Sequence, residues 1–121
     1  MKRILVVDDD SVILMVVTTL LSRSGFDVVT HGTGFDIAEI VHSYSPDVIL
    51  LDIRLPGKSG IEICKDLKNI FSIPVLLFSA HSDKEKALKD SGAEAFIVKP
   101  FDIKKFISVI TVYASYQITE V

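Results

Sequence analysis

The sequence predicts an α/β fold in which a doubly wound, five-stranded parallel sheet lies between helices. Five short apolar runs recur along the 121 residues, and four of them are continuous rather than alternating. A continuous apolar run is typical of a strand that is covered on both faces. The runs are residues 4–7, 28–29, 48–51, 75–78 and 96–98. Segments with helix signals separate them, and this alternation predicts one three-layer domain with five helices.

The first two helices are predicted from segments that end at helix-breaking residues. Residues 11–24 end at Gly25, and residues 35–44 end before Pro46. The next two helices begin at capping boxes, in which a serine precedes a glutamate by three residues. These boxes open helices over residues 59–69 and from residue 82 to Gly92.

The last helix is predicted to begin after Asp102 and to run to the C-terminus. Residues 107–113 are rich in β-branched side chains, which locally favour a strand. Their position after a fifth parallel strand favours a helix instead. The expected core stripe of this helix is Ile103, Phe106, Ile107 and Ile110. A second apolar stripe is Val109, Val112 and Tyr116.

Composition restricts the class of protein. Lys and Arg number 13 against 16 Asp and Glu, so the formal charge is −3 and no basic surplus indicates nucleic-acid binding. The one cysteine, Cys64, excludes an internal disulfide and fits a reducing compartment. No apolar run reaches the ~20 residues of a membrane helix. We therefore expect a cytoplasmic domain with no membrane contact.

Polar side chains follow four of the five apolar runs. They are Asp8, Asp9, Asp10, Asp52, Ser79 and Lys99. Open parallel sheets bind their ligands beyond the carboxyl ends of their strands, so these side chains are expected to meet at one edge. Crowded carboxylates need an opposing charge, which one ammonium and a hard cation such as Mg²⁺ supply. This set outlines a phosphoryl-transfer site with Asp52 as the nucleophile.

Four segments together resemble the receiver domain of two-component response regulators. They are residues 4–10, 51–60, 79–80 and 99–101. Each is weakly specific alone, but all four in this order are specific, and the resemblance spans essentially the whole chain. It implies a single receiver domain over residues 1–121, with the flavodoxin-like strand order 2-1-3-4-5. Because the chain stops soon after the fifth helix, we expect no output domain in these residues. A protein that works alone and one domain of a longer regulator or hybrid kinase both stay open.

The resemblance also implies a role for each acidic residue and for Arg54. Asp52 accepts a phosphoryl group from a histidine kinase or phosphotransfer protein. Asp9 and Asp52 ligate Mg²⁺, together with the backbone carbonyl of Arg54, and Asp8 holds the metal through water. Asp10 is expected to cap the first helix rather than to bind the metal, with Ser11 as the alternative cap.

The remaining implied roles concern the switch. Ser79 donates its hydroxyl to the phosphoryl group, Lys99 pairs with it, and the Lys99–Pro100 bond is expected to be cis. Phe96 stands at the aromatic switch position, although a plain core phenylalanine is an equal alternative. The domain would then change its contacts with a downstream target, and would catalyse its own phosphorylation and dephosphorylation.

Two apolar surfaces predict partner contacts. On the first helix, Leu14 and Met15 are expected on the exposed side, where receivers of this family dock their kinase. The second stripe of the last helix is expected to contribute to a homodimer or target interface, because exposed apolar stripes mark partner sites.

Two other functions compete with a phosphorylated receiver. A receiver-like interaction module that is never phosphorylated stays open, because Phe96 and Ser79 depart from the commoner tyrosine and threonine. A phosphatase of the DxDx type is disfavoured, because Arg54 stands where its second aspartate belongs. His31, His42 and His81 lack metal-ligand spacing and are predicted to be surface residues. Cys64 is predicted to be a buried apolar residue.

Overall fold

The computed structural model describes residues 1–80 and 83–115, and five parallel strands form a single sheet in the order β2-β1-β3-β4-β5. The predicted topology is therefore confirmed. The strands are β1 (Arg3–Val7), β2 (Asp27–His31), β3 (Val48–Asp52), β4 (Val75–Ser79) and β5 (Ala95–Val98). The helices are α1 (Ser11–Arg23), α2 (Ile37–Tyr44), α3 (Gly60–Ile70), α4 (Lys84–Ser91) and α5 (Ile103–Ala114).

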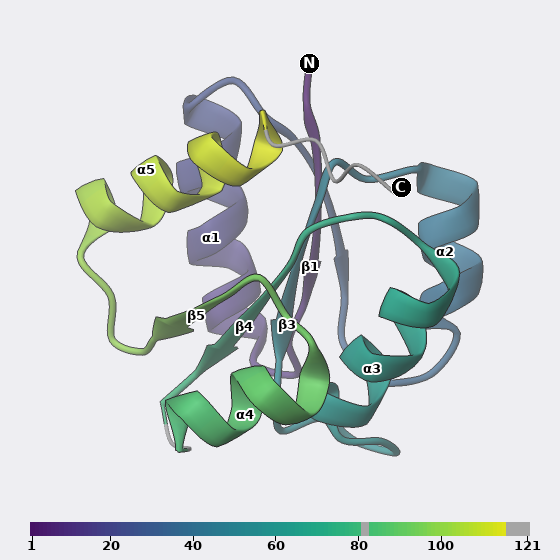
Figure 1. Cartoon of the computed structure of the whole chain (residues 1–121). Helices are drawn as coiled ribbons and strands as arrows, with labels where there is room; N and C mark the ends of the chain where they lie inside the picture. The colour runs from purple at the N-terminus through teal and green to yellow at the C-terminus, as the bar shows by residue number, and fades with distance from the viewer. Residues whose placement is uncertain (81–82, 116–121) are drawn as a thin grey trace.

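The helices form two layers, with α1 and α5 on one face of the sheet and α2, α3 and α4 on the other (Figure 1). Successive strand residues point to opposite faces, so Leu50 joins the core under α1 and α5, while Ile49 and Leu51 join the core under α2, α3 and α4. All five residues of β3 and of β4 are buried. This burial explains why these runs are continuous in the sequence.

The helix starts follow local capping chemistry. The side chain of Asp10 accepts hydrogen bonds from the backbone N–H groups of Val12 (2.9 Å) and Ile13 (3.3 Å), so Asp10 and not Ser11 caps α1. Ser59 caps α3 as predicted. The prediction for α2 was two residues too early, because Asp36 has a left-handed conformation with φ of 62° and the helix begins after it.

Two helix predictions in the C-terminal half fall partly outside the described residues. The cap of α4 is Asp83, which accepts from the N–H of Lys86, and Ser82 of the predicted capping box lies outside the described residues. Helix α4 does end at Gly92, with φ of 75°. Helix α5 runs from Ile103 to Ala114 with Ser115 as its C-cap, and residues 116–121 of the predicted last helix lie outside the described residues.

The exposed faces of α1 and α5 differ in part from the predictions. Met15 is exposed as expected, but Leu14 is half-buried against the core. On α5, Ile103 is 55% exposed and is not part of the core stripe, because the first turn extends beyond the sheet-facing core that begins at Phe106. Val112 is exposed, whereas Val109 packs partly against the core, and Tyr116 lies outside the described residues. Within residues 1–80 and 83–115, no helix has both the length and the apolar character needed to cross a membrane.

Candidate active site

The carboxyl ends of β1, β3, β4 and β5 meet around one pocket of about 290 Å³. Its lining comprises Asp8, Asp9, Asp10, Asp52, Arg54, Ser79, Ala80 and Lys99. Every polar residue that the sequence places after a strand therefore lies at this edge of the sheet. Parallel pairing produces this convergence, because β1, β3, β4 and β5 all run in the same direction.

Lys99 holds two buried aspartates together. Its Nζ lies 2.6 Å from Oδ2 of Asp8 and 3.2 Å from Oδ2 of Asp52. The same ammonium lies 4.6 Å from the ring centroid of Phe78, which is fully buried beneath it. The amine at residue 99 is thus directed into the pocket.

Burial and charge shift the proton affinities of this pair. Burial raises the pKa of the Asp52 carboxyl, and the negative charge of Asp8 adds to the rise, although the N–H of Arg54 and the ammonium of Lys99 oppose it. Burial opposes the charge of Lys99, but its hydrogen bond to Asp8 and the charge of Asp52 outweigh this, so the pKa of Lys99 is raised. Lys99 therefore stays charged at neutral pH beside crowded carboxylates.

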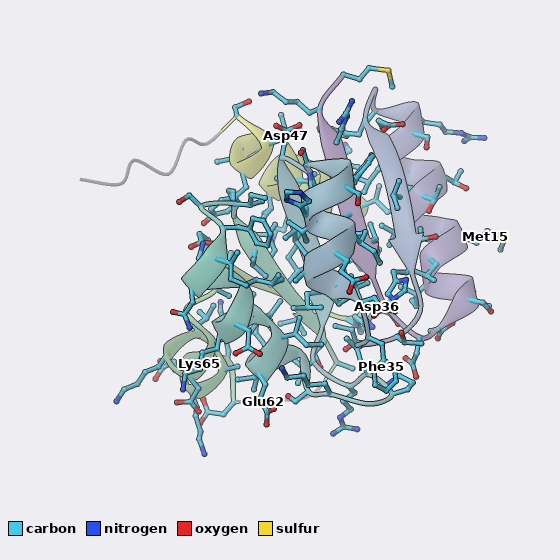
Figure 2. The ribbon with its side chains drawn as sticks, turned by 90° about the vertical axis from the view of Figure 1, so that its right-hand side faces the viewer. Met15, Phe35, Asp36, Asp47, Glu62 and Lys65 are labelled. Atoms are coloured by element: carbon cyan, nitrogen blue, oxygen red, sulfur yellow. The ribbon has the colours of Figure 1, made fainter. Side chains whose placement is uncertain are left out.

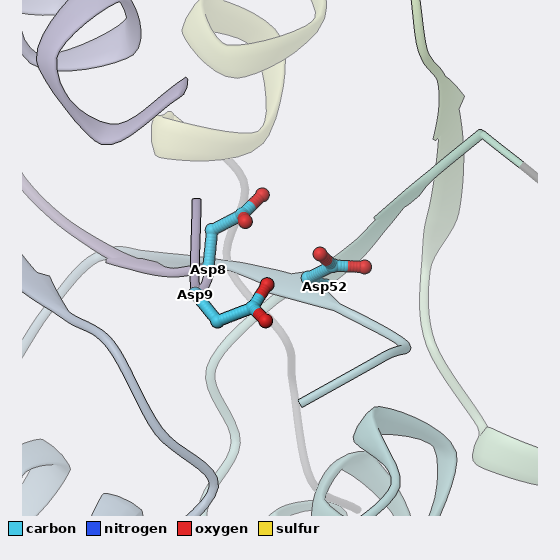
Figure 3. A group of neighbouring side chains, drawn as sticks. All are labelled: Asp8, Asp9 and Asp52. Carbon is cyan, nitrogen blue, oxygen red and sulfur yellow. The ribbon is translucent and has the colours of Figure 1, made fainter. Parts of the chain in front are cut away.

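The three carboxylates of Asp8, Asp9 and Asp52 gather at the ends of β1 and β3 (Figure 3). Each offers an oxygen within 4.8 Å of the others. Both oxygens of Asp8 already accept protein donors, Oδ1 from the N–H of Asp10 at 2.9 Å and Oδ2 from Lys99. The carboxylate of Asp9, in contrast, is exposed. This donor set carries a formal charge of −3 before Lys99 offsets one unit, and hard oxygen ligands of this kind fit Mg²⁺.

Backbone contacts hold the loop after β3 beside the pocket. The N–H of Arg54 donates to Oδ1 of Asp52 at 3.2 Å, and the side chain of Arg54 is exposed. The N–H of Gly60 donates to the carbonyl of Ile53 at 2.8 Å, and a Cβ at residue 60 would overlap the carbonyl oxygen of Asp52. This positioning role of Gly60 was not predicted, because it depends on how closely the start of α3 approaches the end of β3.

The other predicted residues fall around this centre. Ser79 is buried at the end of β4 and lines the pocket, and the Lys99–Pro100 bond is cis as predicted. Phe96 is half-buried beside the core under α2, α3 and α4. This position is compatible with either interpretation of that ring.

The histidines and the cysteine lie away from the pocket lining in the described parts of the chain. His42 is exposed as predicted, and His81 lies outside the described residues. His31 is half-buried, and its Nε2 donates to the carbonyl of Phe35 at 2.8 Å, so it is less exposed than His42. Cys64 is buried, as predicted, and burial raises the pKa of its thiol to about 11.

Most of the chain is similar in sequence to known proteins of one family. A family model described as "Response regulator receiver domain" matches residues 4–111. The DNA-binding response regulator MtrA of Mycobacterium leprae is 36% identical over 109 residues, which make up 88% of this chain and 48% of that protein. The chain thus spans about half the length of the curated relatives it matches.

Solved structures match the fold over nearly the whole chain. The BeF3-activated N-terminal receiver domain of Klebsiella pneumoniae RstA matches with a TM-score of 0.90 at 26% identity, covering 95% of this chain and 100% of that chain. The chemotaxis response regulator CheY4 of Vibrio cholerae matches with a TM-score of 0.83 at 27% identity, covering 93% of this chain and 98% of that chain.

Proposed function

The chain belongs to the response regulator receiver family of two-component signalling, and from this premise we propose that Asp52 accepts a phosphoryl group from a phosphohistidine donor. One observation carries the assignment. The carboxylate of Asp52 is buried at the end of β3, among two further aspartates and 3.2 Å from the ammonium of Lys99. A carboxylate in such a setting is a nucleophile beside the positive charge that phosphoryl transfer requires.

We propose that Asp9, Asp52 and the backbone carbonyl of Arg54 hold Mg²⁺. When bound, this ion would neutralise charge that develops on the phosphoryl oxygens. Asp8 contributes differently, because both of its oxygens accept donors from the protein. It orients Lys99 and would reach the metal through water.

The transfer itself follows from these positions. An oxygen of Asp52 attacks phosphorus, a P–O bond forms as the P–N bond to the donor imidazole breaks, and the imidazole keeps the electron pair. Lys99 offsets the added charge of about −1.5 to −2. Ser79 donates its hydroxyl to a phosphoryl oxygen. Attack of water on the acyl phosphate later restores the carboxylate, so the domain catalyses both its own loading and its own reset.

The partners follow from this role. We propose that a histidine kinase or phosphotransfer protein is the donor, and that the domain acts in the cytoplasm through a downstream target protein. A homodimer through α5 is a further proposal, supported by the exposed Val112 on that helix. The curated relatives are DNA-binding regulators, but this chain corresponds only to their receiver part, so we assign it no DNA contact of its own.

Incubation with phosphoramidate and Mg²⁺, followed by intact-mass measurement, tests the proposal. The wild-type protein should gain the mass of one phosphoryl group and lose it over time, and the Asp52→Asn variant should gain none. Asp90→Asn, an exposed aspartate on α4, is the matched control and should behave as wild type. A wild-type protein that gains no mass would support the non-phosphorylated interaction module instead.

A further inference from the structure

A groove between α2 and α3 lies apart from the active site and shares none of its lining residues. Its volume is about 260 Å³. The buried apolar side chains of its lining are those of Ile37, Ile63 and Leu67, which belong to the core. Figure 2 faces this side of the molecule, with Phe35 and Asp36 near the start of α2 and Glu62 on α3.

Large apolar side chains are exposed at this groove. Ile70, at the end of α3, lines it and is 64% exposed. Phe35 is 58% exposed and stands between Gly34 and Asp36, which both line the groove. The Phe35 ring lies against Gly57, so one side of the ring packs on the loop after β3. Exposed apolar groups around an apolar hollow are typical of a contact surface.

The rim of the groove is acidic. Its lining includes three carboxylates, those of Asp36, Glu39 and Asp66, and one ammonium, that of Lys58, which leaves a formal charge of −2. Lys58 is paired with Asp66. In the described ranges, 1–80 and 83–115, Asp36 and Glu39 form no ion pair. Two exposed negative charges at the start of α2 are therefore available to a partner.

We propose that this groove binds a short segment of a partner protein in which large apolar side chains are flanked by lysine or arginine. The hollow has room for one or two such side chains, and Ile70 and Phe35 extend the apolar contact at its edges. The acidic rim selects basic over acidic segments by charge complementarity. The proposal does not depend on phosphorylation of Asp52, and the Asp52→Asn variant should bind equally well.

Synthetic peptides test the proposal with the full chain labelled with ¹⁵N. The probe is an acetylated hexapeptide with Phe-Leu between two lysines on each side. Its titration should shift amide resonances of residues 34–39 and 58–70, with a Kd of about 0.1–1 mM, as expected for a small apolar contact with exposed charge pairs. Peptides with glutamates in place of the lysines, or with Ser-Ser in place of Phe-Leu, should leave these resonances unshifted.

Matched variants locate the contact. Glu39→Lys should weaken binding by about three- to tenfold, because it replaces an attraction between exposed charges by a repulsion. Glu85→Lys makes the same change in the first turn of α4, which has the same length as α2, and should leave binding unchanged. Ile70→Ser should weaken binding by a similar factor, and Met15→Ser, at an equally exposed position on α1, should not.

Four results would overturn the proposal. They are no shifts in the groove at millimolar peptide, equal binding of the glutamate peptide, equal weakening by Glu85→Lys, and shifts that depend on protein concentration without peptide. The last would identify a second copy of this chain as the occupant.

Discussion

Replacing Asp52 by asparagine should stabilise the metal-free protein. The amide keeps the shape of the side chain and removes a buried charge that burial and Asp8 both disfavour. Oxygens of Asp8 and Asp52 lie within 4.8 Å, so their repulsion is about 3.5 kcal/mol at an effective dielectric constant of about 20. The attraction of Lys99 at 3.2 Å, about 5 kcal/mol on the same scale, offsets that repulsion and part of the burial cost.

The net gain expected for Asp52→Asn is about 1–2 kcal/mol at neutral pH, because the cost of burying this charge and its repulsion from Asp8 together exceed the attraction of Lys99. A carboxyl with a raised folded-state pKa contributes its full stability below its unfolded pKa and loses it as pH rises through the folded pKa. The advantage of the variant should therefore vanish in acid, below the ordinary carboxyl pKa of 3.8 that applies to the unfolded chain. Magnesium at a hundred times its Kd should stabilise wild type by about 2.7 kcal/mol. Wild type should then be more stable than Asp52→Asn.

Urea unfolding monitored by circular dichroism measures these differences in stability. Backbone signals are the suitable probe because the sequence has no tryptophan. Asp90→Asn, at an exposed position, should change neither the stability nor its response to magnesium by more than about 0.5 kcal/mol. The reasoning would be refuted if Asp52→Asn lowered the stability of the metal-free protein, or if magnesium stabilised both proteins equally.

Three further substitutions test the surroundings of the site and the core. Gly60→Ala should destabilise the fold by about 3 kcal/mol and slow phosphoryl uptake, because the added Cβ would overlap the carbonyl oxygen of Asp52. Gly32→Ala is the control and should keep uptake near wild type, because the atom nearest to its added Cβ is 3.9 Å away. Lys99→Met should cost about 3 kcal/mol in urea unfolding at neutral pH, because it leaves buried carboxylates unpaired, and acid should reduce that cost. The stability of wild type should fall by about 2 kcal/mol relative to Cys64→Ala as pH rises from 9 to 11, because the folded state holds the thiol proton more tightly than the unfolded chain does. Parallel pH profiles of the two proteins would contradict this.

The strand pattern could be predicted because burial on both faces leaves a direct record in composition. Residues 48–51 and 75–78 are wholly apolar, and the structure buries every one of them. Convergence at one edge was predictable for the same reason, since parallel strands place Asp52 and Lys99 on a common side. Local capping by Asp10 and Ser59 depends only on neighbouring backbone groups.

What could not be predicted depends on tertiary placement. Helical periodicity groups Ile103 with Phe106, but it does not say where along α5 the sheet begins to cover the helix. The left-handed conformation of Asp36 delays the start of α2, and no residue type at that position requires it. The role of Gly60 depends on how closely the start of α3 approaches β3, which is a property of packing rather than of local pattern.

A crystal structure of the protein with Mg²⁺ and beryllofluoride tests the central claim most directly. Beryllofluoride stands in for the phosphoryl group on a carboxylate. We predict the adduct on Asp52, with Ser79 and Lys99 contacting its fluorines and the metal bound by Asp9, Asp52 and the carbonyl of Arg54. A metal bound elsewhere, an unmodified Asp52, or a Lys99 side chain turned into solvent would contradict the account.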